Sequence, residues 1–192
     1  MSSIKLESNV SGTGIFTIAS PNSNTNRTLT LPDNTGTILT SATTTGFPAG
    51  SVIQVVSATT STSTNVASTS YTDSGLSASI TPSSSSSKIL VVSSISADVV
   101  RQSNVVAFAY SRLVRGATQI IEQGGYFGAG TSSTGYVYFP HCHSIIYLDS
   151  PATTSSTTYK VQGKLDSTAS SAQFRFQMES LTSTMTLMEI AA

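Results

Sequence analysis

Apolar and polar residues alternate with a period of two along much of the chain from about Gly50 onward. The clearest examples are residues 159–165 and 174–179, where apolar residues alternate with Lys, Arg, Gln and Glu. Successive side chains of a strand point to opposite faces, so this pattern predicts strands with one face on a core and the other in solvent. The run from Lys88 to Ser93 is apolar at successive positions, which predicts a strand covered on both faces.

Short clusters of Gly, Pro, Asp and Ser separate these runs and predict turns, because these residues adopt the backbone angles that turns need. We expect turns at residues 73–75, 81–87, 115–116, 124–125 and 149–151. No stretch keeps the i, i+3, i+4, i+7 apolar spacing of an amphipathic helix. Short strands at this spacing are typical of a sandwich, jelly roll or barrel, and we predict an all-β fold with two antiparallel sheets, a β-sandwich or jelly roll.

The N-terminal residues 1–48 carry only short strand-like pieces, two of which flank the turn at residues 32–36. A segment of this size cannot bury enough apolar surface to be stable alone. It must pair with the rest of the chain, with a sister subunit or with a larger scaffold. We therefore predict an N-terminal β anchoring segment and linker at residues 1–48 and a folded domain at residues 49–192.

Charged residues make up only 9% of the chain, against roughly 25% in typical soluble domains. Nine basic and nine acidic residues leave a formal net charge of zero, which argues against nucleic acid as a partner, because phosphate binding needs clustered Lys and Arg. The 38% of hydrophobic residues argues against disorder. The N-terminus lacks a secretory signal and the strongest apolar run is too short for a bilayer, so we expect no membrane insertion.

Both histidines and the only cysteine lie together at His141, Cys142 and His143, a combination that suggests metal binding or Cys/His chemistry. On a strand, the two histidines share a face with Ile145 and Tyr147, while Cys142 points to the other face. This arrangement cannot ligate one metal ion, and two histidines are fewer ligands than zinc requires. We therefore expect no metal, cofactor or catalytic role within one chain, and Cys142 to be a small buried hydrophobe. In a homotrimer, however, His141 and His143 of all subunits could meet on the threefold axis and hold a metal ion.

Other catalytic motifs are missing from the sequence. It has no Gly-x-Ser-x-Gly elbow followed by a suitable Asp and His, no P-loop and no dinucleotide-binding glycine motif. The carboxylates form no local pair suited to glycoside hydrolysis. The sequence therefore predicts a protein that is not an enzyme.

The only local basic concentration consists of Arg101, Arg112 and Arg115, and we expect a strand to end in a turn at Arg115 and Gly116. Solvated arginines are the default interpretation, because exposed ion pairs contribute little to stability. The alternative is a salt bridge between subunits, with Glu122 or Asp149 as the acidic partner.

Residues 29–39, LTLPDNTGTIL, resemble the LTLP…TGT.L element in N-terminal segments of tailed-phage virion proteins, notably those of cyanophages and other aquatic phages. Residues 50–56 resemble the first strand of the C-terminal domains of such proteins. The same resemblance continues through residues 71–76, 80–82, 87–91, 148–151 and 157–161. Together these pieces touch most of the chain, and their order is the specific feature.

The resemblance implies a trimeric jelly-roll domain, similar in outline to the heads of complement C1q and tumour necrosis factor, and it transfers no catalytic residue. It also implies a place on the virion surface, with the major capsid protein or a tail adaptor as partner. This chain lacks a long repetitive shaft between the segment and the domain, which argues against a long tail fibre. The anchoring segment would attach through Leu29, Leu31, Pro32, Gly36, Ile38 and Leu39.

The leading functional hypothesis is a homotrimeric decoration (cement) protein on a phage head, anchored through strand pairing. Apolar residues occupy both faces of the last strand, which suits a strand between the subunit core and a trimer interface. The interface candidates are Tyr147, Met185, Leu187, Met188 and Ile190.

The alternative is a short tail fibre or receptor-binding head that binds a host surface glycan. Its recognition loop would carry Tyr126, Phe127 and Tyr136, since binding residues are common on loops held by a rigid scaffold. An enzyme such as a depolymerase fits the sequence least.

Overall fold

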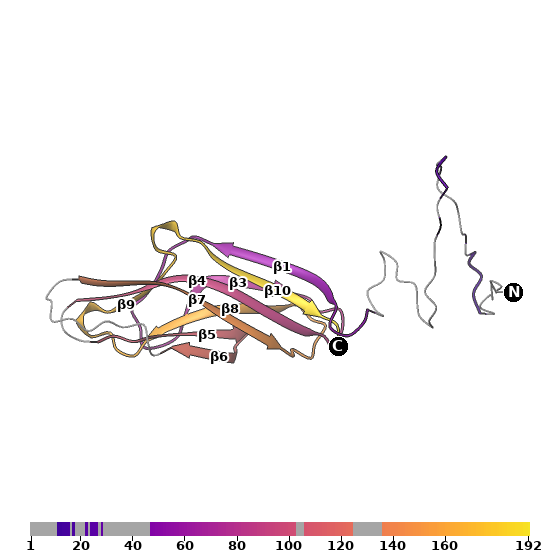
Figure 1. Ribbon diagram of the computed structural model, residues 1–192. Helices are drawn as coiled ribbons and strands as arrows, with labels where there is room; N and C mark the ends of the chain where they lie inside the picture. The colour runs from indigo at the N-terminus through magenta and orange to yellow at the C-terminus, as the bar shows by residue number, and fades with distance from the viewer. Residues whose placement is uncertain are drawn as a thin grey trace. The chain divides into compact units, whose positions relative to one another are not determined.

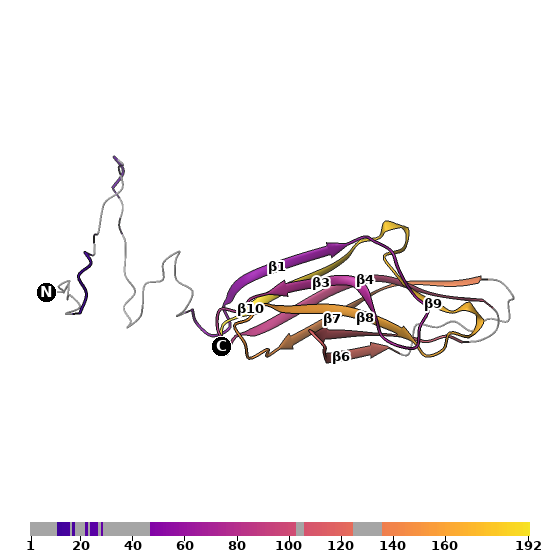
Figure 2. The same cartoon turned by 180° about the vertical axis from the view of Figure 1, so that it is seen from behind.

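The described part of the chain consists almost entirely of antiparallel strands in two sheets that pack face to face (Figures 1 and 2). The structure is a computed structural model and describes residues 11–15, 17, 22, 24–26, 28, 47–102, 106–124 and 136–192. The six-stranded sheet contains β1 (Val52–Thr60), β2 (Thr64–Val66), β4 (Lys88–Gln102), β7 (Tyr136–Asp149), β9 (Gln173–Phe176) and β10 (Ser183–Ile190). The four-stranded sheet contains β3 (Thr72–Ile80), β5 (Ala109–Arg115), β6 (Thr118–Gly124) and β8 (Thr157–Leu165). The helical elements of these residues are the short 3-10 turns η1 (Ala169–Ser171) and η2 (Met178–Ser180), so the predicted all-β antiparallel sandwich is confirmed.

The strand order is that of a jelly roll. In the six-stranded sheet, β10 and β9 follow one another along the same side of β4, with β1 and β2 beside them and β7 on the other side of β4. Taking each such pair as one interrupted strand gives the order β1/β2, β10/β9, β4, β7, and the second sheet has the order β3, β8, β5, β6. Each sheet thus interleaves strands from the two halves of the domain, as the two Greek keys of an eight-stranded jelly roll do.

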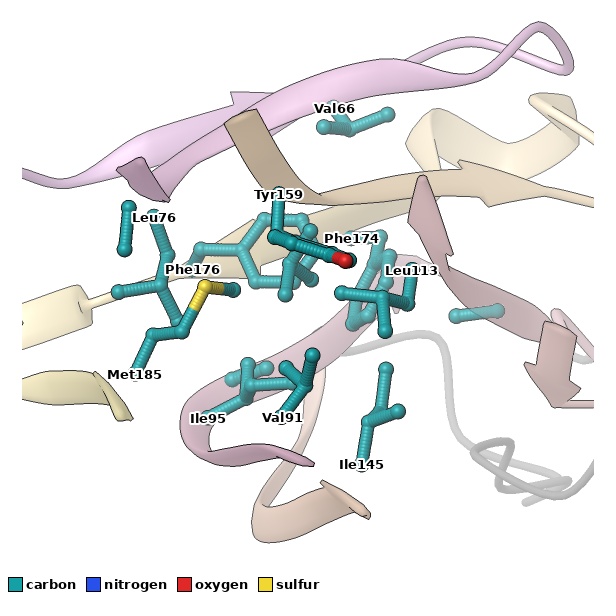
Figure 3. Packing of buried hydrophobic residues seen from close by; sticks show 14 of the residues in the cluster. Val66, Leu76, Val91, Ile95, Leu113, Ile145, Tyr159, Phe174, Phe176 and Met185 are labelled. Atoms are coloured by element: carbon teal, nitrogen blue, oxygen red, sulfur yellow. The ribbon is translucent and has the colours of Figure 1, made fainter. Parts of the chain in front are cut away.

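The hydrophobic core lies between the two sheets and takes every second residue of the strands, as the alternation predicted. In β4 the core residues include Ile89 and Val91, and in β8 they include Tyr159 and Val161, all fully buried. Figure 3 shows side chains from both sheets meeting in this layer, with Tyr159 from one sheet and Phe174 from the other. Burial of this apolar surface is the main force that holds the sheets together.

Gly163 is the residue on the buried face of β8 that lacks a side chain, and aromatic rings of the opposite sheet fill the space. A Cβ atom at Gly163 would lie 2.6 Å from Cζ of Phe176 and 2.7 Å from Cε1 of Phe174. The two rings also pack against each other, with centroids 4.4 Å apart. Interiors are close-packed, so neither ring has free room to move away. Gly163 therefore sets the spacing of the sheets at this point.

Gly75 forms a bulge in β3 rather than the turn predicted at residues 73–75. The pairing of β3 with β8 shifts between Asp73 and Ser77, and Gly75 has a φ of +85°. A residue without Cβ adopts this angle easily, and here β3 carries two more residues than β8 over the same stretch. The prediction was wrong because a bulge and a turn favour the same residue. The predicted turns at residues 81–87, 115–116 and 149–151 do separate strands and are confirmed.

Both ends of the jelly roll lie at one pole, which we call the proximal pole. The Gly50 N–H donates to the Ala191 carbonyl at 2.8 Å, and the Ala191 N–H donates to the Ser51 carbonyl at 2.8 Å. The opposite, distal pole contains β9 and the ends of β4 and β7 that pair Gln102 with Tyr136 (Figure 1). The two poles therefore present different strands to the surroundings.

Two buried carboxylates hold the proximal pole together. Asp149 accepts hydrogen bonds from Arg115 Nη1 at 2.6 Å and from the Tyr159 hydroxyl at 2.7 Å. Glu189 accepts from the backbone N–H and from the hydroxyl of Ser83, both at 2.7 Å. Burial opposes ionisation of Glu189, but its hydrogen bonds, those from Ser83 first among them, outweigh burial and hold its pKa below the ordinary value.

The chain divides into two units, Met1–Gly36 and Thr37–Ala192. The strands described here all lie within residues 52–190 and so within the predicted domain at 49–192. The predicted anchoring residues lie outside the described residues: Leu29, Leu31, Pro32, Gly36, Ile38 and Leu39. The anchoring role of residues 1–48 stays a prediction. The part of the chain that the structure describes contains no helix with the length and hydropathy of a membrane span.

Candidate functional site

An apolar surface crosses the outer face of the six-stranded sheet near the proximal pole. The pairing registers place Val55, Met188, Leu90 and Leu148 in one row across β1, β10, β4 and β7. The next row toward the distal pole contains the pair Val92 and Ile146 on β4 and β7. We call the apolar residues of these two rows the outer patch: Val55, Leu90, Val92, Ile146, Leu148 and Met188.

The outer patch is open to solvent in a single subunit. Ile146, Val55 and Leu148 are 61%, 57% and 48% exposed, although all three are large aliphatic residues. Leu90, Val92 and Met188 between them are half-buried. Scattered apolar residues are normal on a surface, but contiguous rows of them mark surfaces that meet another molecule. The outer patch is therefore a candidate contact surface.

The polar residues that surround the outer patch on these strands are uncharged. They are Ser57, Thr59, Ser94, Ser144, Thr184 and Thr186. On the proximal side, the adjoining row pairs Lys88 with Ile190 and so brings in one charge at the rim. An uncharged surface can meet an identical copy of itself without the repulsion that like charges would cause.

The structure separates the predicted interface residues into two groups. Met185 and Leu187 are fully buried and belong to the core, and Tyr147 packs against that core. Tyr147 is half-buried, so its interface role stays a prediction. Met185 and Leu187 have no exposed surface and cannot meet a second subunit, so these two assignments are corrected. Met188 and Ile190 alternate with them on β10 and lie half-buried on the outer face. For these two residues the interface role stays a prediction.

The histidine face of β7 points into the sandwich. His143 Nε2 lies 2.9 Å from Ser111 Oγ on β5, and the His141 ring stacks on Phe174 with centroids 6.2 Å apart. Burial lowers the pKa of His143 to about 4, with repulsion from His141 adding to the effect, so this ring is neutral at neutral pH. A metal site formed by His141 and His143 on a threefold axis is therefore contradicted, because the rings face the other sheet of their own subunit. No group of three or more His, Cys, Asp or Glu among the described residues could hold a metal ion.

Cys142 is exposed on the outer face of β7, two rows beyond Ile146, so the expectation of a buried cysteine was wrong. Its Sγ atom lies 3.3 Å from Ser94 Oγ on β4. The prediction that Cys142 and the histidines point to opposite faces was correct. The error was to assume that both faces of this strand are covered within one subunit.

Arg115 forms its ion pair within the subunit. Its Nη1 atom lies 2.6 Å from Asp149 Oδ2. Asp149 was one of the two acidic residues expected to pair with an arginine of another subunit, but the ion pair forms within one chain. The neighbouring Arg112 donates from Nε to Gln162 Oε1 at 2.9 Å and lies over the Tyr71 ring, 3.9 Å from its centroid. These arginines stabilise one sandwich and leave no argument for a salt bridge between subunits.

The predicted recognition loop lies mostly beyond what the structure describes. Tyr126 and Phe127 are outside the described residues, and Tyr136 is the first residue of β7. The role of these three residues stays a prediction.

No protein-family model matches this chain, and no curated protein matches it. Solved structures from infectious bursal disease virus align with much of it. A structure of the Gx strain covers 72% of this chain and 37% of that chain at 15% identity, with a TM-score of 0.31. The VP2 subviral particle covers 74% of this chain and 39% of that chain at 13% identity, with a TM-score of 0.32. The alignments span well under half of those proteins, and a likeness at these TM-scores carries no conclusion about function.

The outer patch was visible from the sequence only in part. The run from Lys88 to Ser93 predicted a strand covered on both faces, and Leu90 and Val92 are the outer half of that run. Sequence reasoning missed the contribution of Val55 from β1. Its place beside Met188 depends on the register between distant strands, which a local pattern does not contain.

Proposed function

We propose that this chain is a non-enzymatic structural protein of a phage virion that assembles as a homotrimer through the outer patch. In this proposal it is a decoration (cement) protein on the head surface. Residues 1–48 anchor to the major capsid protein by strand pairing, and the jelly roll forms the exposed knob. Support for the virion setting comes from the sequence, above all from LTLPDNTGTIL at residues 29–39.

The single observation that carries self-assembly is the exposed apolar outer patch. Fully burying an aliphatic side chain of this size contributes about 1.5–3 kcal/mol, and the patch offers several such side chains side by side. Sheet faces that meet around a threefold axis make head-to-tail contacts that close into a ring. The lack of charge within the patch, with Lys88 as the one charge at its rim, suits contact with identical copies.

The trimer can be tested by placing one charge in the outer patch. We expect sedimentation equilibrium to show a trimer at micromolar concentration and the variant Leu148→Glu to sediment as a monomer. A buried, unpaired carboxylate at the interface costs several kcal/mol of association, whereas Leu148 is 48% exposed in the free subunit. Circular dichroism should show that the variant keeps its strand content.

Ser77→Glu is the matched control, because Ser77 is exposed on the outer face of the other sheet. This variant should stay trimeric. A monomeric wild-type protein, or a Leu148→Glu variant that stays trimeric, would contradict an interface at the outer patch.

Electron microscopy of virions labelled with antibody against this protein tests its position. A decoration protein should give label over the whole head surface. Label confined to the tail would refute decoration and support the alternative, a short tail fibre or receptor-binding head that adheres to a host surface glycan. One observation supports this alternative. A pocket, the kind of feature that a receptor-binding head needs, opens at the distal pole, away from the point where the chain enters the sandwich.

A further inference from the structure

A pocket of about 470 Å³ opens on the outer face of the six-stranded sheet at the distal pole. Along β4, Ser96 at the near edge of the pocket lies four residues from Val92 at the near edge of the outer patch, which is roughly 14 Å at ~3.4 Å per residue. The volume falls within the range of about 300–1,000 Å³ that is usual for small-molecule sites. The pocket and the outer patch are therefore two separate features of one sheet.

The floor of the pocket contains a fixed ion pair. The registers place Arg175, Asp98 and Pro140 in one row across β9, β4 and β7. Arg175 donates from Nε to Asp98 Oδ1 at 2.8 Å and from Nη2 to Oδ2, so two parallel bonds hold the guanidinium. The Arg175 and Asp98 side chains are only 16% and 10% exposed, which makes the pair a rigid part of the sheet surface.

Arg175 still has hydrogen-bond donors to offer. A guanidinium carries five N–H groups and the bonds to Asp98 use two of them. No further acceptor for Arg175 is found in the described part of the chain. Its guanidinium carbon lies 5.3 Å from the ring centroid of Tyr138, a residue that is 56% exposed. Fixed donors and an exposed aromatic ring are thus next to each other.

One wall of the pocket is the interruption between β9 and β10, at residues 177–182, which contributes Met178, Glu179 and Leu181. Gln177, Glu179 and Ser180 have φ angles of 52°, 54° and 60°, a left-handed conformation that non-glycine residues keep only when their surroundings impose it. Gln177 supplies that constraint, because it is fully buried and its side-chain amide lies 2.8 Å from Ser183 Oγ. The amide orientation that satisfies both of its polar atoms also directs the NH2 group to the carbonyls of Ser74 and Thr62, at 3.0 and 3.2 Å. The wall is therefore preorganised.

The charges of the pocket disfavour an anionic ligand. Asp98 neutralises Arg175, and Glu179 is exposed and has no ion-pair partner among the described residues. An anionic ligand would face two carboxylates and no uncompensated cation. The matching ligand accepts hydrogen bonds from Arg175, donates to Glu179 and presents an apolar face to Tyr138. Saccharides combine these properties, since their hydroxyls both donate and accept and the C–H face of a pyranose packs on aromatic rings.

We propose that the distal pocket binds a neutral saccharide, with Tyr138 as the stacking surface and Arg175 and Glu179 as the groups that bind hydroxyls. The pocket belongs to a single subunit, so this inference does not depend on the trimer or on the position of the protein in a virion. A saccharide bound here would lie on the pole opposite to Gly50, where the chain enters the sandwich.

An array of neutral and acidic bacterial oligosaccharides tests the proposal with the full-length protein. We expect binding to one or more neutral oligosaccharides. Tyr138→Ala and Glu179→Ala should each weaken that binding about tenfold, because each removes a contact of more than about 1 kcal/mol. The control is Tyr110→Ala, which removes the same ring from the outer face of the other sheet and should leave binding unchanged. Thermal melts of all variants establish that they are folded.

Each alternative outcome of this experiment overturns the proposal. If the protein binds no neutral oligosaccharide, or binds only acidic ones, the pocket does not have the specificity proposed here. Binding that persists in Tyr138→Ala and Glu179→Ala places the saccharide elsewhere on the protein. A lysine tetrapeptide titrated in parallel tests whether the pocket binds basic peptides instead. If the tetrapeptide binds in a way that depends on Glu179, and no saccharide binds, the pocket is a site for basic peptides.

Discussion

Replacing Gly163 with valine is expected to lower the free energy of unfolding by about 3 kcal/mol, near the upper end of the usual cost of overpacking a core. The added Cβ would lie 2.6 Å from Cζ of Phe176 and 2.7 Å from Cε1 of Phe174, both fully buried. Valine favours a strand over glycine by at most about 1 kcal/mol, so the steric clash decides the sign. Urea denaturation followed by circular dichroism measures the change.

A control and a rescue make this prediction specific. Lys160→Val places the same residue on the solvent side of β8 and should cost no more than about 1 kcal/mol, because it removes only the exposed ion pair to Asp73. Phe176→Leu removes the nearest of the clashing ring atoms and leaves those of Phe174, so Gly163→Val with Phe176→Leu should be more stable than the sum of the single changes predicts. A Gly163→Val variant as stable as the wild type would show that Gly163 does not set the sheet spacing.

Lowering the pH from 7 to 5 is expected to reduce the free energy of unfolding by about 2 kcal/mol through His143 alone. The pKa of His143 falls from 6.5 to about 4 on folding, chiefly because of burial. The unfolded chain therefore binds a proton more tightly than the folded chain, and stability is lost as the pH falls through the unfolded pKa. The loss is complete below the folded pKa. Denaturation curves at pH 7, 6 and 5 measure it.

The variant His143→Gln isolates this contribution, because it keeps a polar side chain near Ser111 but does not titrate. Its stability should change by about 2 kcal/mol less than that of the wild type between pH 7 and 5. Asp73 and Glu189 have pKa values below their ordinary 3.8 and 4.5, so their stabilising effect is lost only at lower pH and equally in both proteins. Equal pH dependence in the two proteins would mean that His143 is not buried in its neutral form.

The alternation of residue types predicted which residues share a face and, for most strands, which face is buried. It did so for β8 because one face carries Tyr159, Val161 and Leu165 and the other carries lysine and glutamine. On β7 both faces are apolar in part, with Ile145 on one side and Ile146 on the other. No local property distinguishes those faces, so the sequence could group Cys142 apart from the histidines but could not say which group would be exposed.

The distal pocket was beyond sequence reasoning for another reason. Its ion pair joins Arg175 to Asp98, which are 77 positions apart in the chain. Tyr138 joins them only because β7 and β9 flank β4 at the same level. Such a site is a product of strand register, and register is fixed by the packing of the whole sandwich rather than by any one segment.

The interruption between β9 and β10 can change in sequence and length independently of the two strands that flank it. β10 keeps its register with β4 through Thr184 to Ile190, and β9 keeps its own through Gln173 to Phe176. The residues that follow Gln177 can therefore lengthen, shorten or change without disturbing either pairing. Insertions there would alter the lining of the pocket while the rows of the outer patch stay unchanged. If the pocket binds a saccharide and the outer patch forms the trimer, a lineage could change its ligand and keep its assembly.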